Sequence, residues 1–381
     1  MIAVLSTVVA AAQLAAPARP AAPAASSAAY IPPPIVSTQP VGAARTLFAW
    51  MPGTVACDGM TVAPVAMRRP LTSLAWSGAD GTRTVTYRFR IDAAGRPLSI
   101  ARDVGGYNIQ TEDIAPSLAA SRFPAGVARA DCAITYTTRS TPLAEAPVAD
   151  LMSYSITPMT GALPRAGWDR IMPVGTSCRT DPPPRILLRA YPDFLAFPPT
   201  PGVRGWSMVG YDLDARGRPI RVRTVGGTGN PALDTASVKA VAASRFTPGA
   251  RAGCLYPYWQ NPATIAAPPL PDRVGTVDTA NRCPAGDWSY RPAPIYPQPW
   301  HRRAIEGWAV VAFDVAPWGD IGNVRVVASE PGADFGMEAL RLLRGARKPV
   351  SATGHVGCVE RIHFVMKAKA PAPADPVVTD D

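Results

Sequence analysis

Alternating apolar and polar residues mark three short stretches of the chain as β-hairpins. From Thr84 to Ile100 the sequence is TVTYRFRIDAAGRPLSI, and every second residue of its first half is apolar. The stretches Trp206–Val222 (WSMVGYDLDARGRPIRV) and Trp308–Val326 (WAVVAFDVAPWGDIGNVRV) follow the same pattern. A period of two is typical of a half-buried strand, and the glycine within each stretch predicts a tight turn.

A helix and a closing strand are predicted after each hairpin. In the second stretch the helix begins near Asn230-Pro231, a pair that suits a helix N-terminus. Residues at helical spacing follow in the second and third stretches: Leu233, Ser237, Ala240 and Val241, and then Met337, Leu340 and Arg344. The segment Cys358–Met366 (CVERIHFVM) has the pattern of a final strand. Each unit of about 90 residues is therefore predicted to be α+β, with a small antiparallel sheet and one long helix packed on one face.

Six cysteines recur at nearly equal intervals, which predicts three tandem copies of one unit. The separations are 75, 76 and 75 residues within the pairs Cys57 and Cys132, Cys178 and Cys254, and Cys283 and Cys358. Each copy thus has its own pair, and we expect one disulfide in each. Because disulfides persist only in oxidising compartments, the pattern favours an exported protein.

Free thiols or a metal site are the alternative use of these cysteines. The chain contains no Cys-x-x-Cys sequence, which argues against a zinc ribbon. His355, Cys358 and His363 lie close together in the sequence. The repeat assigns Cys358 to a disulfide, however, and His363 falls within a predicted strand. We therefore expect no metal and no cofactor.

The N-terminus has the composition of an export signal followed by a linker. An apolar run, Ile2–Ala16, is broken by Pro17 and is shorter than the about 20 residues that a membrane span needs. No basic residue precedes this run, which departs from an ordinary signal peptide. We expect a signal peptide or weak anchor over 1–24, a Pro/Ala-rich linker over 25–46, three units over 47–140, 165–262 and 274–367, and a disordered tail over 368–381.

The basic character of the chain does not indicate a nucleic-acid-binding protein. The net charge is +10, with 38 basic residues, of which only four are lysine. The arginines are scattered, with no run of five or more basic residues, and lack the concentrated stripe or the motif of a nucleic-acid surface. We expect no nucleic-acid partner.

No set of residues with catalytic spacing stands out. The three histidines, His301, His355 and His363, have no nucleophile at a set spacing. The chain lacks a Gly-x-Ser-x-Gly sequence, and the glycine-rich segment 226–229 lacks the lysine of a phosphate loop. We expect that the chain is not an enzyme and has no catalytic residues.

Several motifs of the third unit occur in the order of a known family. They are Tyr296-Pro297, Ile305-Glu306-Gly307, the hairpin around Gly319, a helix from Gly336 to Arg347, and the closing strand. In these residues the third unit resembles the C-terminal domain of the TonB energy-transducer family. The second unit is similar, with Tyr191-Pro192 and Val203-Arg204-Gly205, and the first unit is degenerate.

The resemblance implies a periplasmic protein that binds extended peptide segments by strand addition. In the family these segments belong to outer-membrane transporters, and the contact transmits energy for transport. The candidate edge strand is formed by Glu360, Arg361, Ile362, His363, Phe364, Val365 and Met366. The alternative is an ordinary buried or capped strand. In that case the chain is an envelope structural or interaction protein whose units act as disulfide-stapled spacers. Under both alternatives we expect the partner to be a protein. We expect association with the inner membrane only through the N-terminus.

Overall fold

The computed structural model describes residues 44–77, 81–103, 111–274, 277–278, 283 and 288–366. The predicted signal peptide and the predicted C-terminal tail lie outside these ranges. Within the ranges, no helix is both long enough and apolar enough to cross a membrane.

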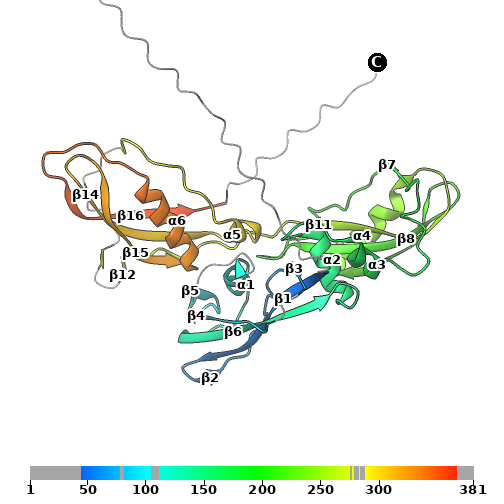
Figure 1. Ribbon diagram of the computed structural model, residues 1–381, viewed down its shortest axis with the longest axis horizontal. Coiled ribbons are helices and arrows are strands. Elements are labelled where there is room, and N and C mark those ends of the chain that lie inside the picture. Colours follow the sequence, from blue (N-terminus) through cyan, green and yellow to red (C-terminus); the bar gives the residue numbers. More distant parts are fainter. Residues whose placement is uncertain are drawn as a thin grey trace, which may run out of the picture. The chain divides into compact units, whose positions relative to one another are not determined.

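Three larger antiparallel sheets, two two-stranded pairs and few helices make up the described chain, which confirms the α+β class (Figure 1). The first sheet has the order β2-β1-β6-β4-β5, and β3 also pairs with β1 on the side away from β6. Its strands are β1 (Arg45–Cys57), β2 (Met60–Thr61), β3 (Ser73–Trp76), β4 (Thr84–Ile91), β5 (Pro97–Arg102) and β6 (Arg129–Pro142). Helix α1 (Ile114–Ala119) lies between β5 and β6 in the sequence.

The second and third sheets have three strands each. The second has the order β11-β8-β9, and the third has the order β15-β14-β16. The second comprises β8 (Gly205–Leu213), β9 (Pro219–Gly227) and β11 (Arg251–Gln260), with helix α4 (Pro231–Ala243) and the small pair β7 (Ile186–Leu188) and β10 (Arg245–Phe246). The third comprises β14 (Gly307–Val315), β15 (Ile321–Glu330) and β16 (His355–Phe364), with helices α5 (Gln298–Arg302) and α6 (Ala333–Arg344) and the pair β12 (Arg273–Val274) and β13 (Val277–Asp278).

The same local order recurs in the three sheets. The first strand of each predicted hairpin is central, the second strand of the hairpin flanks it, and the strand that follows the helix pairs on its other side. The three predicted hairpins are therefore present as β4-β5, β8-β9 and β14-β15. The first sheet differs from the other two because β1 adds a further strand beyond β6.

The two long helices form where the sequence supplies a start and an apolar face. The side chain of Asn230 accepts hydrogen bonds from the N–H groups of Ala232 and Leu233 and so caps α4. In α6 the buried residues are Phe335, Gly336, Ala339, Leu342 and Leu343, which recur at helical spacing.

The prediction of one long helix in every unit is wrong for the first sheet. Helix α1 has six residues, and Pro116 is its third. Proline lacks an N–H and is tolerated only in the first turn, so α1 cannot begin much earlier in the chain. After α1, Arg122 pairs with Ala66 as an isolated bridge, which ends the helical segment.

Two helices that the sequence pattern did not predict cover one face of the second sheet. They are α2 (Val148–Ile156) and α3 (Arg165–Ile171). Leu151 and Met152 of α2 belong to one buried cluster with Trp206 and Met208 of β8. Since α4 packs on the opposite face, β8 is buried on both sides.

Backbone and side-chain contacts join the first sheet to the third. The N–H of Ile100 in β5 donates to the carbonyl of Pro331 at 2.9 Å. The carboxylate of Glu330 accepts hydrogen bonds from the backbone N–H and the hydroxyl of Ser99, and from the guanidinium of Arg90 at 2.7 Å. These bonds cover part of the outer side of β5.

A candidate strand-addition edge

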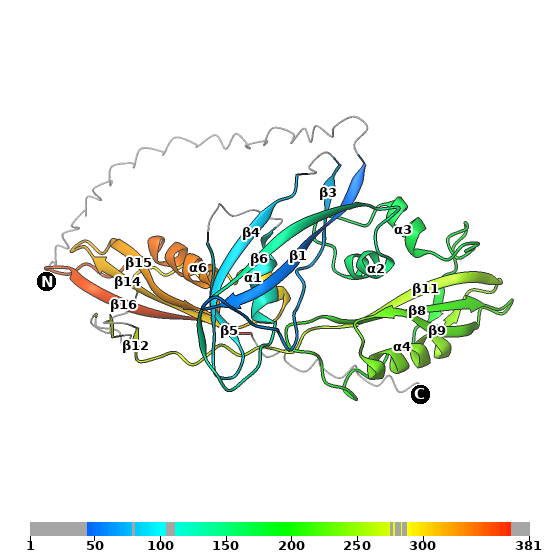
Figure 2. The same ribbon diagram turned by 90° about the horizontal axis from the view of Figure 1, so that it is seen from below.

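Strand β16 lies at one edge of the third sheet, with β14 as its neighbour (Figure 2). The pairing runs in register from Gly307 opposite Phe364 to Phe313 opposite Cys358. Among the described residues, no strand pairs with the outer side of β16. An edge of this kind presents backbone N–H and C=O groups that an incoming extended peptide can pair with.

The side chains of the predicted edge alternate between buried and exposed. Ile362 and Phe364 are each 2% exposed and pack in the core, whereas Arg361, His363 and Val365 are exposed. Glu360 is half-buried and forms an ion pair with Arg291 at 3.0 Å.

The strand ends at Phe364, two residues before the end of the predicted edge. Val365 and Met366 lie beyond it, and the N–H of Met366 donates to Glu306 Oε1 at 2.9 Å. Glu306, which the family motif singled out, therefore anchors the chain just after β16.

The other motif residues hold the same end of β16 in place. The hydroxyl of Tyr296 donates to the carbonyl of Ile305 at 2.6 Å, and its ring packs edge-on against Phe335 and Phe364. Burial raises the pKa of Tyr296, and the Glu306 carboxylate adds to the rise, so the phenol remains a donor. Pro297 is the N-cap residue of α5.

Two glycines of the motif occupy places with no room for a side chain. A Cβ on Gly307 would lie 2.6 Å from the carbonyl oxygen of Glu330 and 2.5 Å from the ring of Phe335. A Cβ on Gly319, at the hairpin turn, would lie 2.1 Å from the carbonyl oxygen of Lys348.

In the first sheet, the side of β6 that corresponds to the outer side of β16 is occupied by β1. The two strands pair from Thr46 opposite Pro142 to Cys57 opposite Cys132 (Figure 2). Strand β1 was not predicted, although the buried run Leu47–Trp50, which ends before Pro52 and Gly53, is typical of a strand that is buried on both faces.

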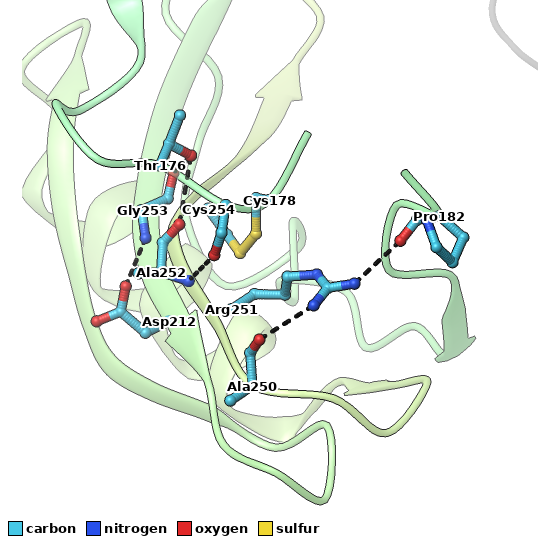
Figure 3. Close-up of a disulfide and its surroundings, with 10 residues drawn as sticks. Thr176, Cys178, Pro182, Asp212, Ala250, Arg251, Ala252, Gly253 and Cys254 are labelled. Atoms are coloured by element: carbon cyan, nitrogen blue, oxygen red, sulfur yellow. Dashed lines mark hydrogen bonds between the residues drawn. A yellow bond between two sulfur atoms is a disulfide. The ribbon is translucent and has the colours of Figure 1, made fainter. Parts of the chain in front are cut away.

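In the second sheet, residues 176–178 cover the start of β11 (Figure 3). The N–H of Ser177 donates to the carbonyl of Ala252 at 3.0 Å, and the N–H of Ala252 donates to the Ser177 hydroxyl at 2.9 Å. The Cys178–Cys254 disulfide holds the segment beside the strand. Only the later part of β11 therefore remains open.

Pro257 makes β11 less suitable for strand addition. It also indicates which N–H groups of β16 face away from β14. It pairs with Met208 without a break in register, so its nitrogen, which carries no hydrogen, lies on the outer side. Counted from the second cysteine of each pair, Pro257 corresponds to Arg361 of β16. His363, two residues later in a strand, has the same orientation, so its N–H points away from β14.

All three predicted disulfides are present. They join Cys57 to Cys132, Cys178 to Cys254, and Cys283 to Cys358. Cys358 is thus a disulfide partner, and the described residues hold no group of histidine, cysteine and carboxylate side chains that could bind a metal ion.

Residues 292–365 match the model of a family described as Gram-negative bacterial TonB protein C-terminal. The matched segment contains α5, α6 and the whole of the third sheet, and therefore includes the candidate edge. No curated protein matches the chain. The match supports the TonB C-terminal family for this segment, and domains of that family interact with proteins such as outer-membrane transporters. The family is one of Gram-negative envelope proteins and is not enzymatic.

Proposed function

We propose that this protein is a periplasmic, TonB-like binding protein that captures an extended peptide segment by strand addition to β16. One observation carries the proposal: the outer side of β16 has no strand partner among the described residues, whereas β6 is paired on both sides. The partner is a segment of an outer-membrane transporter or of another envelope protein, and the contact serves energy transduction for transport.

In this proposal the three sheets are tandem copies of one unit. The outer side of the last strand is paired in the first sheet, partly covered in the second, and without a strand partner among the described residues in the third. The common strand order and the cysteine spacing support this relationship. The residue before the second cysteine of each pair also has a positive φ, which is 45° at Asp131, 68° at Gly253 and 74° at Gly357. Such backbone angles are uncommon outside turns, so their recurrence at one place supports a shared origin.

The proposal is tested by removing one outward N–H from β16. In His363→Pro the ladder with β14 keeps its hydrogen bonds, because the lost N–H points away from β14. We expect a labelled peptide from the periplasmic end of an outer-membrane transporter to bind about two- to tenfold more weakly, the cost of one hydrogen bond. Fluorescence anisotropy with the oxidised full chain measures this change.

His363→Ala is the matched control, because it removes the same side chain and keeps the N–H. Its affinity for the peptide should stay within about twofold of the parent, since only the backbone donor is used. Equal affinities for the proline and alanine variants would contradict strand addition at this edge.

A second candidate function is that of an envelope spacer without a transporter partner. It is favoured by the covering of the corresponding edges in the other two sheets, where β1 pairs with β6 and residues 176–178 cover the start of β11. In that case the parent protein would bind no transporter peptide, and the His363 variants would not differ.

A further inference from the structure

A small cavity beside α2 is lined by an unusual number of arginines. Its volume is about 190 Å³, and Arg68, Arg69, Arg204 and Arg303 line it. Hydroxyl groups line it as well, on Thr72, Ser153, Thr157 and Thr228. The cavity is smaller than the about 300–1,000 Å³ of sites for drug-sized ligands, so it suits a compact group and not a peptide segment.

The carboxylates around the cavity do not balance its positive charge. Asp113 is paired with Arg303 at 2.6 Å, and Asp150 is paired with Arg69 at 3.2 Å. Asp150 is also shared with Arg139, at 3.7 Å. Within the described part of the chain, neither Arg68 nor Arg204 has a carboxylate within ion-pair distance. The cavity therefore holds two excess positive charges.

The same two arginines also have unused hydrogen-bond donors. The Nε atoms of Arg68 and Arg204 are buried and have no hydrogen-bond partner among the described residues. The terminal nitrogens of Arg204 lie 3.4 Å from the Thr157 hydroxyl and 3.5 Å from Asn261 Oδ1, which are long contacts. Burial lowers the pKa of Arg204, and the charge of Arg302 lowers it further, as expected where cations outnumber anions.

Arg303 contributes charge, but four of its five N–H donors are already used. Its guanidinium already makes two hydrogen bonds to Asp113 and one each to the carbonyls of Gly202 and Arg69. A ligand in the cavity would therefore take most of its hydrogen bonds from Arg68 and Arg204, and from the hydroxyl of Ser153 or Thr157.

We propose that this cavity binds a phosphate-type oxyanion through the guanidinium groups of Arg68 and Arg204. Arginine suits this role because its planar donors match two oxygens of a phosphate at once. The phosphate is either free or the head group of an anionic lipid, and the two sources share the same recognition chemistry.

Isothermal titration of the oxidised full chain with inorganic phosphate at low ionic strength tests the proposal. We expect one site per chain, and binding that weakens as sodium chloride is added. Arg68→Gln and Arg204→Gln should each weaken binding by at least about tenfold, because each removes a charge-assisted hydrogen bond. Arg204→Lys should also weaken it, since lysine keeps the charge but loses the paired donors.

Arg223→Gln is the matched control, because Arg223 is an exposed arginine of β9 that does not line the cavity. It should leave the affinity unchanged. Thermal unfolding of each variant without phosphate shows whether the fold is intact. A second arm measures flotation with phosphatidylglycerol vesicles, and flotation that depends on Arg204 assigns the site to a lipid head group.

Two outcomes would overturn the proposal. One is that the folded parent protein binds neither inorganic phosphate nor the vesicles. The other is that Arg223→Gln weakens binding as much as Arg204→Gln, which would mean that net charge alone attracts the anion.

Discussion

Asp113 and Arg303, 190 residues apart in the sequence, form an ion pair that is closed off from solvent. Arg303 Nε donates to Asp113 Oδ1 at 2.8 Å, and Nη2 donates to Oδ2 at 2.6 Å. The Asp113 side chain is 3% exposed, and the Arg303 side chain is 7% exposed. The N–H of Leu71 also donates to Asp113 Oδ2, so the burial of both charges is compensated by hydrogen bonds.

Removing one partner of this pair should destabilise the protein strongly. In Arg303→Ala the Asp113 carboxylate stays buried without its counter-ion, which costs about 3–5 kcal/mol. Arg165→Ala is the control, because Arg165 and Asp169 form an exposed pair at 3.6 Å that contributes at most about 1 kcal/mol. Urea unfolding followed by tryptophan fluorescence compares the two variants. Similar midpoints would show that the buried pair contributes no more than an exposed one.

Local patterns predicted the hairpins and the disulfide partners, because both depend on nearby or repeated residues. The turn at Gly95 and the turn at Gly217 each follow from a few residues in sequence. The Asp113–Arg303 pair could not be predicted in this way. Nothing near either residue in the sequence specifies a partner 190 positions away.

The candidate edge shows the same limit. The pattern of Ile362 and Phe364 predicted a strand, and β16 is present. Whether an edge is open depends on what lies beside it, and the closing strand β1 comes from a segment that precedes the first hairpin. Pro257 was the one local residue that could have identified β11 as an edge strand. Proline has no N–H for a neighbouring strand, so it is confined to edge strands.

The hairpin glycine of the third sheet should tolerate no side chain. Gly319 has a φ of 92°, and a Cβ there would lie 2.1 Å from the Lys348 carbonyl oxygen. Lys348 N–H also donates to the carbonyl of Gly319 at 2.9 Å, so the two segments cannot separate without losing that bond. We expect Gly319→Ala to lower the free energy of unfolding by about 2–3 kcal/mol.

Gly59→Ala separates the backbone effect from the steric one. Gly59 has a φ of 78°, and a Cβ there would meet nothing within 4 Å. Gly59→Ala should therefore lower the free energy of unfolding by only about 1–2 kcal/mol, because the left-handed backbone conformation is unfavourable for alanine. Chemical denaturation of both variants gives the comparison, and equal losses would refute a steric role for the Lys348 carbonyl.

The Cys178–Cys254 disulfide should control access to the start of β11. In the double variant Cys178→Ser/Cys254→Ser, residues 176–178 keep only a few hydrogen bonds to Ala252 and Gly253. We expect the Ala252 amide to exchange with deuterium much faster than in the parent. In the chain-entropy model the bond that spans 76 residues contributes about 4.5 kcal/mol, so unfolding should also become easier.

The Cys57–Cys132 pair offers the matched comparison. Cys57 and Cys132 lie opposite each other in the long β1-β6 ladder, which has many further backbone bonds. Replacing both by serine should lower global stability by a similar amount, because the loop of 75 residues is nearly the same length. Amide protection along β6 should nevertheless persist. Loss of that protection would mean that the disulfide and not the ladder holds β1 in place.

Asp212 and Asp314, which lie in the central strands β8 and β14, should make the protein less stable in acid. The backbone N–H of Gly253 donates to Asp212 at 2.6 Å and lowers the pKa of that carboxyl, with a further contribution from Arg221. The pKa of Asp314 is lowered by the Asn323 amide and by the N–H of Gly357 at 2.8 Å.

A carboxyl whose pKa is lowered by folding stabilises the folded state only when ionised. This stabilisation is present above the unfolded pKa of about 3.9 and is lost as the pH falls through the lower folded value. In Asp212→Asn the ionisable group is absent, so unfolding free energies measured between pH 5 and pH 2 should fall less steeply than in the parent. Arg221→Gln should flatten the profile less, because the Gly253 N–H is the larger cause of the shift. If the profile of Asp212→Asn runs parallel to the parent profile, the Gly253 hydrogen bond does not stabilise the charged form.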